Sequence, residues 1–369
     1  MNIWDNLPKP FFVLAPMDDI TDTVFRQIIA SLPYPADLSG VQGVAEERSE
    51  AYQEYVDQVP EAITQQSVKN SSRVGGYADK SDAVIRGYGA PDLFFTEFVN
   101  VDGLQSPGRE KLIPKLMFTE TERPIIAQIW GKNPENYYKT AQDLVEMGYD
   151  GIDINMGCPV KTVVRDGCCA AMMNNRELAV EIIQATREGA GTLPLSVKTR
   201  TGYSGVDLTW HELLLGQKLE ALIIHGRTKA QMSKVPADWD IIEQIREFRD
   251  ATAPETKIVG NGDVQTRSHG LELVKKYKLD GIMIGRGIFD DPFVFADKSS
   301  WPEYTRQQKM NLYRQHVELF AKTWQKNERK LITLNKFCKI YINGFDGAKD
   351  LREKLMSATS VEELLKNLS

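Results

Sequence analysis

Residues 151–159 read Gly-Ile-Asp-Ile-Asn-Met-Gly-Cys-Pro. Ile152 and Ile154 are apolar and β-branched, so this stretch begins as a strand, and the glycine and proline that follow end it. Asn155 and Cys158 are therefore placed where a strand gives way to a loop. In a barrel of parallel strands that place is the catalytic rim, although most free cysteines are simply small buried hydrophobes.

Strand-like apolar runs recur along the chain, and most are separated by segments with helical spacing. The eight runs cover residues 11–15, 93–98, 125–130, 151–155, 195–199, 221–225, 257–261 and 281–285. The intervening helices are expected at 21–31, 133–147, 177–188, 209–219, 239–248 and 267–276, with Gly148 capping the second of them. This alternation predicts an α/β fold, a (β/α)8 TIM barrel with parallel strands.

Two regions interrupt the pattern. Residues from about 35 to 90 are polar and acidic, with a helix expected at 44–59, and are too long for an ordinary crossover, so they are interpreted as an atypical insertion. From about Trp301 onward strand signals are missing and helical spacing returns at 312–324, 331–341 and 348–356. The predicted domains are a barrel at 1–297 and a small all-α domain at 298–369.

The net charge of −6 is unevenly distributed. Residues 298–369 contain 14 Lys and Arg against 8 Asp and Glu, a net +6, whereas residues 1–297 contain 31 against 43, a net −12. A basic module on an acidic body points to a polyanionic partner, although a merely soluble helical surface would look similar.

Neither a secretory signal nor a membrane span is expected, because Asp5 and Lys9 interrupt the N-terminus and no apolar run approaches about 20 residues. The four cysteines (158, 168, 169 and 338) form no paired framework, which favours a reducing cytoplasm. Neither CxxC nor HExxH occurs, so no metal site is expected. The oligomeric state is left open, with a monomer as the expectation.

Polar residues stand at or near the ends of all eight predicted strands. Singly, each has an ordinary structural explanation, but together they line one rim; they include Glu97, Gln128, Asn155, Lys198, Arg200, His225, Asn261 and Arg286. The last two strand ends carry Asn261-Gly262-Asp263 and Gly285-Arg286-Gly287, at the position where barrels build a phosphate site. No GxGxxG follows the first strand, so a flavin mononucleotide fits better than a Rossmann dinucleotide.

These motifs resemble those of the dihydrouridine synthases, flavoenzymes that reduce uridine in tRNA. The similar stretches are Ala15-Pro16-Met17, Thr96-Glu97-Phe98, Asn155-Met156-Gly157-Cys158-Pro159, residues 196–200, His225-Gly226-Arg227-Thr228, and the two glycine-containing ends just named. Residues 343–352 are similar to the motif of the family's helical domain.

The resemblance implies NADPH-dependent reduction of the C5–C6 bond of uridine through FMN, in a tRNA-binding enzyme. It implies Cys158 as the catalytic acid and FMN binding by Pro16, Met17, Asp18, Gln128, Lys198, His225, Asn261, Gly262, Asp263, Gly285 and Arg286. It implies substrate binding by Glu97, Asn155, Lys161, Arg165 and Arg200. A cysteine with its ordinary pKa of about 8.5 would be protonated at neutral pH and able to donate.

Two features depart from the family pattern. The insertion at about 35–90 could obstruct RNA or serve another partner. Cys168-Cys169 stands where small residues are more usual, and this change is expected to leave the chemistry untouched. Two alternatives remain: a small-molecule FMN oxidoreductase of the dihydroorotate dehydrogenase or ene-reductase type, and a non-catalytic RNA-binding protein.

Overall fold

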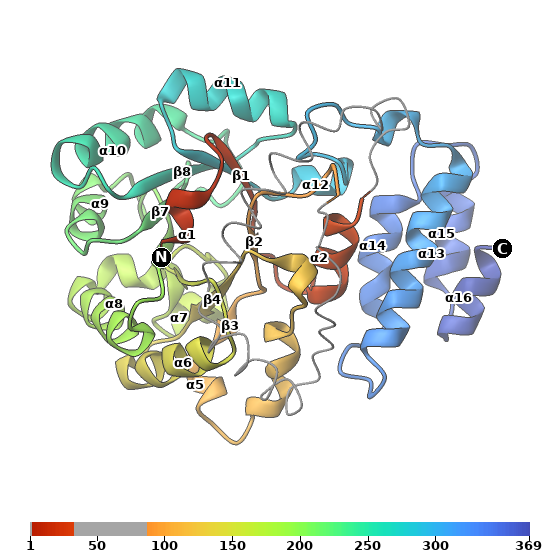
Figure 1. Ribbon diagram of the computed structural model, residues 1–369, viewed down its shortest axis with the longest axis horizontal. Helices are drawn as coiled ribbons and strands as arrows, with labels where there is room; N and C mark the ends of the chain where they lie inside the picture. The colour runs from red at the N-terminus through yellow and green to blue at the C-terminus, as the bar shows by residue number, and fades with distance from the viewer. Residues whose placement is uncertain (1, 33–86) are drawn as a thin grey trace.

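The computed structural model describes residues 2–32 and 87–369, and its centre is a barrel of parallel strands surrounded by helices (Figure 1). The predicted α/β barrel is confirmed. The strands are β1 (Phe11–Leu14), β2 (Phe94–Phe95), β3 (Val99–Asn100), β4 (Ile125–Trp130), β5 (Gly151–Asn155), β6 (Leu195–Arg200), β7 (Ala221–His225), β8 (Lys257–Asn261) and β9 (Gly281–Ile284).

The strand order around the barrel is β1-β9-β8-β7-β6-β5-β4-β2, and a parallel bridge between Val13 and Leu93 joins its two ends. Of the stretch 93–98, predicted as one strand, only β2 is a strand, and β3 begins just after it; both pair with β4. Between them the Thr96 hydroxyl accepts the N–H of Gln128 at 3.1 Å. A side chain thus takes a position in the ladder that a backbone carbonyl would otherwise hold.

Helices cover the outside of the barrel, and polar side chains cap most of their first turns. Asn133 accepts the N–H of Glu135 at the start of α6, and Gly148 follows the helix with φ +76°, as predicted. The helices of this part are α1 (Ile3–Asn6), α2 (Thr23–Ala30), α5 (Val101–Leu104), α6 (Pro134–Glu146), α7 (Lys161–Arg165), α8 (Arg176–Ala190), α9 (Leu208–Leu215), α10 (Trp239–Thr252), α11 (Arg267–Tyr277) and α12 (Gly287–Asp290).

Alternating strand residues fill the barrel interior, because successive side chains point to opposite faces. Phe11, Phe95 and Ile223 belong to one buried apolar cluster, and α1 adds Trp4 to it from the amino ends of the strands. This cluster fills the barrel near the amino ends of the strands. The next inward positions, toward the carboxyl ends, are therefore available for polar side chains.

The C-terminal region is all-helical, as predicted. Its helices are α13 (Arg306–Thr323), α14 (Leu334–Tyr341), α15 (Ala348–Met356) and α16 (Val361–Asn367). Helix α13 begins six residues before the predicted start, because Thr305 and Gln308 form a capping box there, and α16 was not predicted. The domain boundary at 297/298 stays a prediction. The predicted insertion, including the helix at 44–59, lies outside the described residues except for 87–90.

The helical region packs on the barrel through α2, which lies beside α13 and α14 (Figure 1). The Phe25 and Phe337 rings have centroids 5.2 Å apart across this contact. Between α13 and α14, Arg329 reaches the barrel rim and forms a buried ion pair with Glu97, whose side chain is 0% exposed. Burial raises the pKa of Glu97 and the Arg329 charge opposes that rise. The described helices include none long and apolar enough to cross a membrane.

Replacing Arg329 with Met should lower the thermal stability of the protein markedly. Removing one partner of a buried pair leaves an uncompensated charge, which costs about 3–5 kcal/mol. The matched control is Lys349→Met, which breaks an exposed pair with Glu353 and should have little effect. Equal melting temperatures for the two variants, measured by differential scanning calorimetry, would contradict this account of the contact.

Candidate active site

The predicted rim residues meet at the carboxyl ends of adjacent strands. Strand register pairs Asn155 with Lys198, Arg200 with His225, and His225 with Asn261. Gln128 comes one strand earlier, two residues after the inward-facing Ile126. The structure therefore brings together side chains that are up to 133 positions apart in the sequence.

The loop carrying Cys158 is held from two sides. The Asn155 Oδ1 atom accepts the N–H groups of Gly157 at 3.1 Å and Cys158 at 3.0 Å. From β6, Arg200 Nε donates to the carbonyl of Gly157 at 2.7 Å. Because Arg200 also donates to the carbonyl of Thr228 at 3.3 Å, it ties this loop to the one after β7. The substrate contact predicted for Arg200 stays a prediction.

The Cys158 thiol is half-buried and shares a hydrogen bond with the thiol of Cys169. This bond, helped by the Val160 N–H and the Arg200 and Lys198 charges, lowers the pKa of Cys158 to about 7 against the opposing effect of burial. The expectation of an ordinary cysteine pKa is therefore wrong. The expectation that the Cys168-Cys169 change leaves the chemistry untouched stays a prediction, although Cys169 contacts the candidate acid directly.

Cations gather at the ends of β6 to β9. The pKa of His225 is lowered to about 2, so this imidazole is neutral. Burial is the largest cause, and the positive charges of Lys198, Arg200, Arg227 and Arg286 act in the same direction. Burial also lowers the pKa of Lys198 to about 8, with the Arg200 charge acting in the same direction. A site with this excess of positive charge is suited to an anionic ligand.

The glycine-containing loop after β8 has a shape that requires glycine at one position. Gly262 has φ +134°, and an added Cβ would lie 2.6 Å from the Cβ of Ala237. Next to it, Asp263 forms ion pairs with Arg227 and with Arg286, the latter at 3.3 Å. On the neighbouring β6, Lys198 Nζ donates to Asn261 Oδ1 at 3.2 Å. Gly285 and Arg286 follow β9, which is adjacent to β8 in the barrel, so both predicted phosphate-binding loops lie at one side of the mouth.

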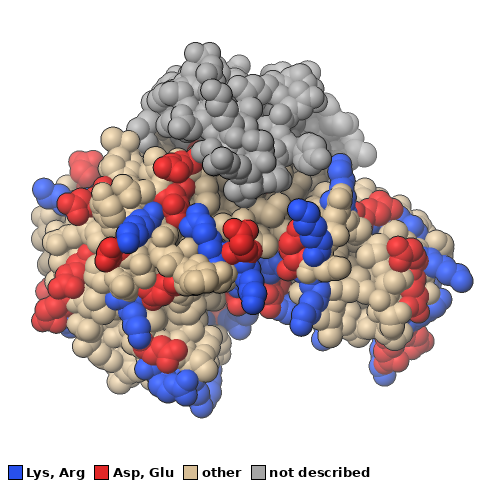
Figure 2. All heavy atoms as spheres, turned by 90° about the horizontal axis from the view of Figure 1, so that it is seen from below, with Lys and Arg blue, Asp and Glu red and all other residues tan. Residues whose placement is uncertain are grey.

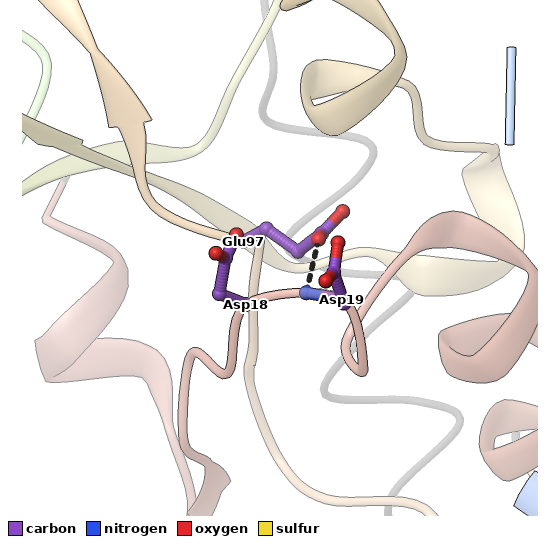
Figure 3. A group of neighbouring side chains, drawn as sticks. All are labelled: Asp18, Asp19 and Glu97. Atoms are coloured by element: carbon purple, nitrogen blue, oxygen red, sulfur yellow. Dashed lines mark hydrogen bonds between the residues drawn. The ribbon is translucent and has the colours of Figure 1, made fainter. Parts of the chain in front are cut away.

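Three carboxylates lie together where β1 and β2 end (Figure 3). Asp18 and Asp19 come from the loop after β1, close to Pro16 and Met17, and the N–H of Asp19 donates to Glu97 Oε1 at 2.7 Å. One oxygen from each of the three groups lies within 4.8 Å of the other two.

Side-chain cations pair with each of these carboxylates. Lys115 pairs with Asp18, Arg329 with Glu97 and Asp19, and Lys336 with Asp19 at 3.3 Å. The cluster is therefore an ion-pair network between barrel and helical region. Glu97 and Asp18 both belong to this network. The predicted substrate contact of Glu97 and the predicted FMN contact of Asp18 stay predictions.

Helix α7, which begins three residues after Cys158, carries the two remaining predicted substrate residues, Lys161 and Arg165. Both side chains are exposed, and Arg165 Nε lies 3.7 Å from Oδ1 of its neighbour Asp166. Their charge is thus available beside the candidate acid.

Sequence reasoning missed Asp153, Cys169 and Arg227 as parts of the site. Asp153 is two residues before Asn155 on β5, so alternation alone places it on the same inward face. Arg227 lies inside the motif His225-Gly226-Arg227-Thr228, but the sequence alone predicts no role for it. No sequence signal pairs Cys169 with Cys158, since the contact depends on the turn after α7.

The family model described as dihydrouridine synthase matches residues 13–369. The probable tRNA-dihydrouridine synthase 2 of Bacillus subtilis (strain 168) is 39% identical over 367 residues, covering 98% of this chain and 94% of its own. The probable tRNA-dihydrouridine synthase of Staphylococcus aureus (strain COL) is 39% identical over 365 residues, covering 98% and 93%. Among solved structures, a morphinone reductase aligns with a TM-score of 0.44 at 11% identity, covering 80% of this chain and 86% of its own.

Removing the Cys169 thiol should make Cys158 less acidic. The rate at which iodoacetamide alkylates Cys158 follows its thiolate fraction, so its midpoint should lie near pH 7 and should move toward about 8.5 in Cys169→Ala. Mass spectrometry resolves the site, because trypsin places Cys158 in peptide 140–161, apart from Cys168 and Cys169. Cys338→Ala is the control. An unchanged midpoint in Cys169→Ala would contradict the assigned contact.

Proposed function

Since the chain belongs to the dihydrouridine synthase family, we propose that it reduces uridine in tRNA to 5,6-dihydrouridine, with FMN as its flavin and NADPH as reductant. The observation that carries the proposal is the position of Cys158, a titratable thiol held by Asn155 and Arg200 beside a cation-rich barrel mouth. The free cysteines among the described residues agree with a cytoplasmic location.

The cation-rich mouth fits a phosphorylated cofactor. The loops at Gly262 and Gly285, with Arg286, would hold the phosphate, because glycine lets the backbone approach and arginine offers a fork of donors. Lys198, Gln128, His225 and Asn261 would face the ring, and Pro16, Met17 and Asp18 would border it from β1. When bound, FMN supplies the hydride for C6 of the uracil ring.

Cys158 would donate the proton to C5 of the uracil ring. The loop bonds from Asn155 and Arg200 fix the position of the sulfur, and only its protonated form can act as an acid. Because its pKa is about 7, that form predominates below neutral pH and declines above it. The tRNA-dependent step should therefore slow as the pH rises through that value.

The RNA would contact both α7 and the helical region. Lys161 and Arg165 lie in the helix after Cys158. On α14, Lys336 pairs with Asp19 at the rim, and the exposed Lys339 lies three residues further along the helix. On the face seen in Figure 2, basic and acidic side chains are interspersed over the barrel and the helical region, without one continuous basic patch. Phosphate contacts of this kind position RNA without reading its sequence.

The direct test is to separate the two half-reactions. The purified protein should release FMN on denaturation, and NADPH should bleach the bound flavin in wild type and in Cys158→Ala at similar rates. Reoxidation by bulk tRNA should slow about 10²–10⁴-fold in Cys158→Ala, the usual contribution of a positioned acid. Stopped-flow absorbance measures both rates.

Cys338→Ala is the control, because this buried cysteine lies on α14, and it should reoxidise normally. Protein that binds no FMN, or a Cys158→Ala variant that reduces tRNA at the wild-type rate, would contradict the proposal. Reoxidation by small enones but not by tRNA would instead favour a small-molecule reductase.

The role of α14 is tested by charge removal. The double variant Lys336→Gln/Lys339→Gln should bind tRNA more weakly, and each lost phosphate contact should reduce the slope of log K against log salt by about 0.7–0.9. Lys354→Gln/Lys366→Gln removes the same charge from the outer helices α15 and α16 and should leave the slope unchanged. Identical slopes for both double variants would place the RNA contact elsewhere.

A further inference from the structure

We propose that Asp153 is a positioning residue: its carboxylate sets the orientation of the Gln128 and Asn155 amides and, through them, holds the loop that carries Cys158. The geometry is independent of the proposed function, and only the activity readout of the test rests on that function.

Asp153 lies at the centre of β5 and is fully buried. One carboxylate oxygen accepts Gln128 Nε2 from β4 at 2.7 Å, and the other accepts Ser196 Oγ from β6 at 2.6 Å. These are also its register neighbours, so the barrel itself fixes the three side chains side by side. An ionised carboxylate has no proton to donate, and Gln128 must therefore turn its NH₂ group toward Asp153.

The orientation of Gln128 determines that of Asn155. With its NH₂ group on Asp153, Gln128 presents Oε1 to Asn155 Nδ2, at 2.9 Å. Asn155 then has its own oxygen free for the loop, where it accepts the N–H groups of Gly157 and Cys158. Each amide has one donor end and one acceptor end, so the chain of bonds from Asp153 to Cys158 has a single direction.

Both ends of this chain are chemically unambiguous. Asp153 only accepts and the two backbone N–H groups only donate, so the amide assignments between them follow from bonding. If Gln128 turned over, Asn155 would have to turn as well, and its NH₂ group would face two N–H donors. Because buried donors without an acceptor are costly, the loop would then lose the bonds that hold it in place.

The site keeps this carboxyl buried between two neutral partners. Burial raises the pKa of Asp153 to about 6, while its hydrogen bonds to Ser196 and Gln128 and the Lys198 charge oppose the rise. Burying a charge without a directly bonded cation is costly, so stability alone does not account for it. Holding two amides in one orientation does account for it.

The test compares Asp153→Ala with Asp153→Asn. The alanine leaves Gln128 Nε2 without its acceptor, whereas the asparagine can keep an oxygen on Nε2 because the Ser196 hydroxyl can turn to accept its NH₂ group. In Asp153→Ala, kcat for tRNA reduction should fall about 10- to 100-fold, the range that small misplacements cost, with KM for tRNA within about twofold. Asp153→Asn should restore kcat to within about threefold of wild type.

Two further outcomes decide the case. Wild-type kcat in Asp153→Ala would overturn the proposal, and an Asp153→Asn variant as impaired as the alanine would show that charge matters rather than orientation. Should Asp153→Ala fail to fold, the double variant Asp153→Asn/Ser196→Ala removes the hydroxyl that holds the asparagine NH₂ group in place. Its kcat should then be at least about fivefold below that of Ser196→Ala alone.

A readout that needs no activity separates this proposal from the proposed function. Hydrogen–deuterium exchange of peptides covering 155–160 should speed up in Asp153→Ala and stay at the wild-type rate in Asp153→Asn. If wild type fails to reduce tRNA but exchange behaves in this way, the function is wrong and the positioning role stands. Unchanged exchange in Asp153→Ala overturns the positioning role whatever the enzyme reduces.

Discussion

The structure depends on one constraint: a closed barrel has a single interior, and every inward side chain must find its partners there. Apolar residues such as Phe95 and Ile223 fill the lower part. Above them, polar side chains lie too deep for bulk water and must hydrogen-bond to one another. The bonds among Asp153, Gln128 and Asn155 are the direct result.

This constraint also explains why the site is partly visible in the sequence. Strand 151–155 and its loop, and the strands at 125–130, 221–225 and 257–261, were predicted with the observed bounds, because β-branched runs and glycine or proline ends are local signals. The rim positions can be predicted because successive side chains of a strand point alternately into and out of the barrel. The family resemblance then supplied roles that the residues alone left open.

What the sequence could not show are contacts made by tertiary geometry. Thr96 follows the short β2, and its hydroxyl accepts the N–H of Gln128 on β4. Arg329 reaches Glu97, which is 232 positions earlier in the chain. Cys169 contacts Cys158 through a turn in which Cys169 has φ +53°, and this contact is the largest of the effects that lower the pKa of Cys158. Neither composition nor periodicity carries that information.

The pairing of β1 with β9 has a consequence for how the chain is made. Phe11 and Leu14 pair with Gly281 and Ile284, so the first strand emerges from the ribosome long before its partner exists. Until then its edge and the apolar side chains of α1 have no barrel to enter, and such edges invite association with other chains. Even after β9 has formed, α2 keeps an apolar face exposed until α13 is complete. The N-terminal segment is thus the first part synthesised and among the last to be buried.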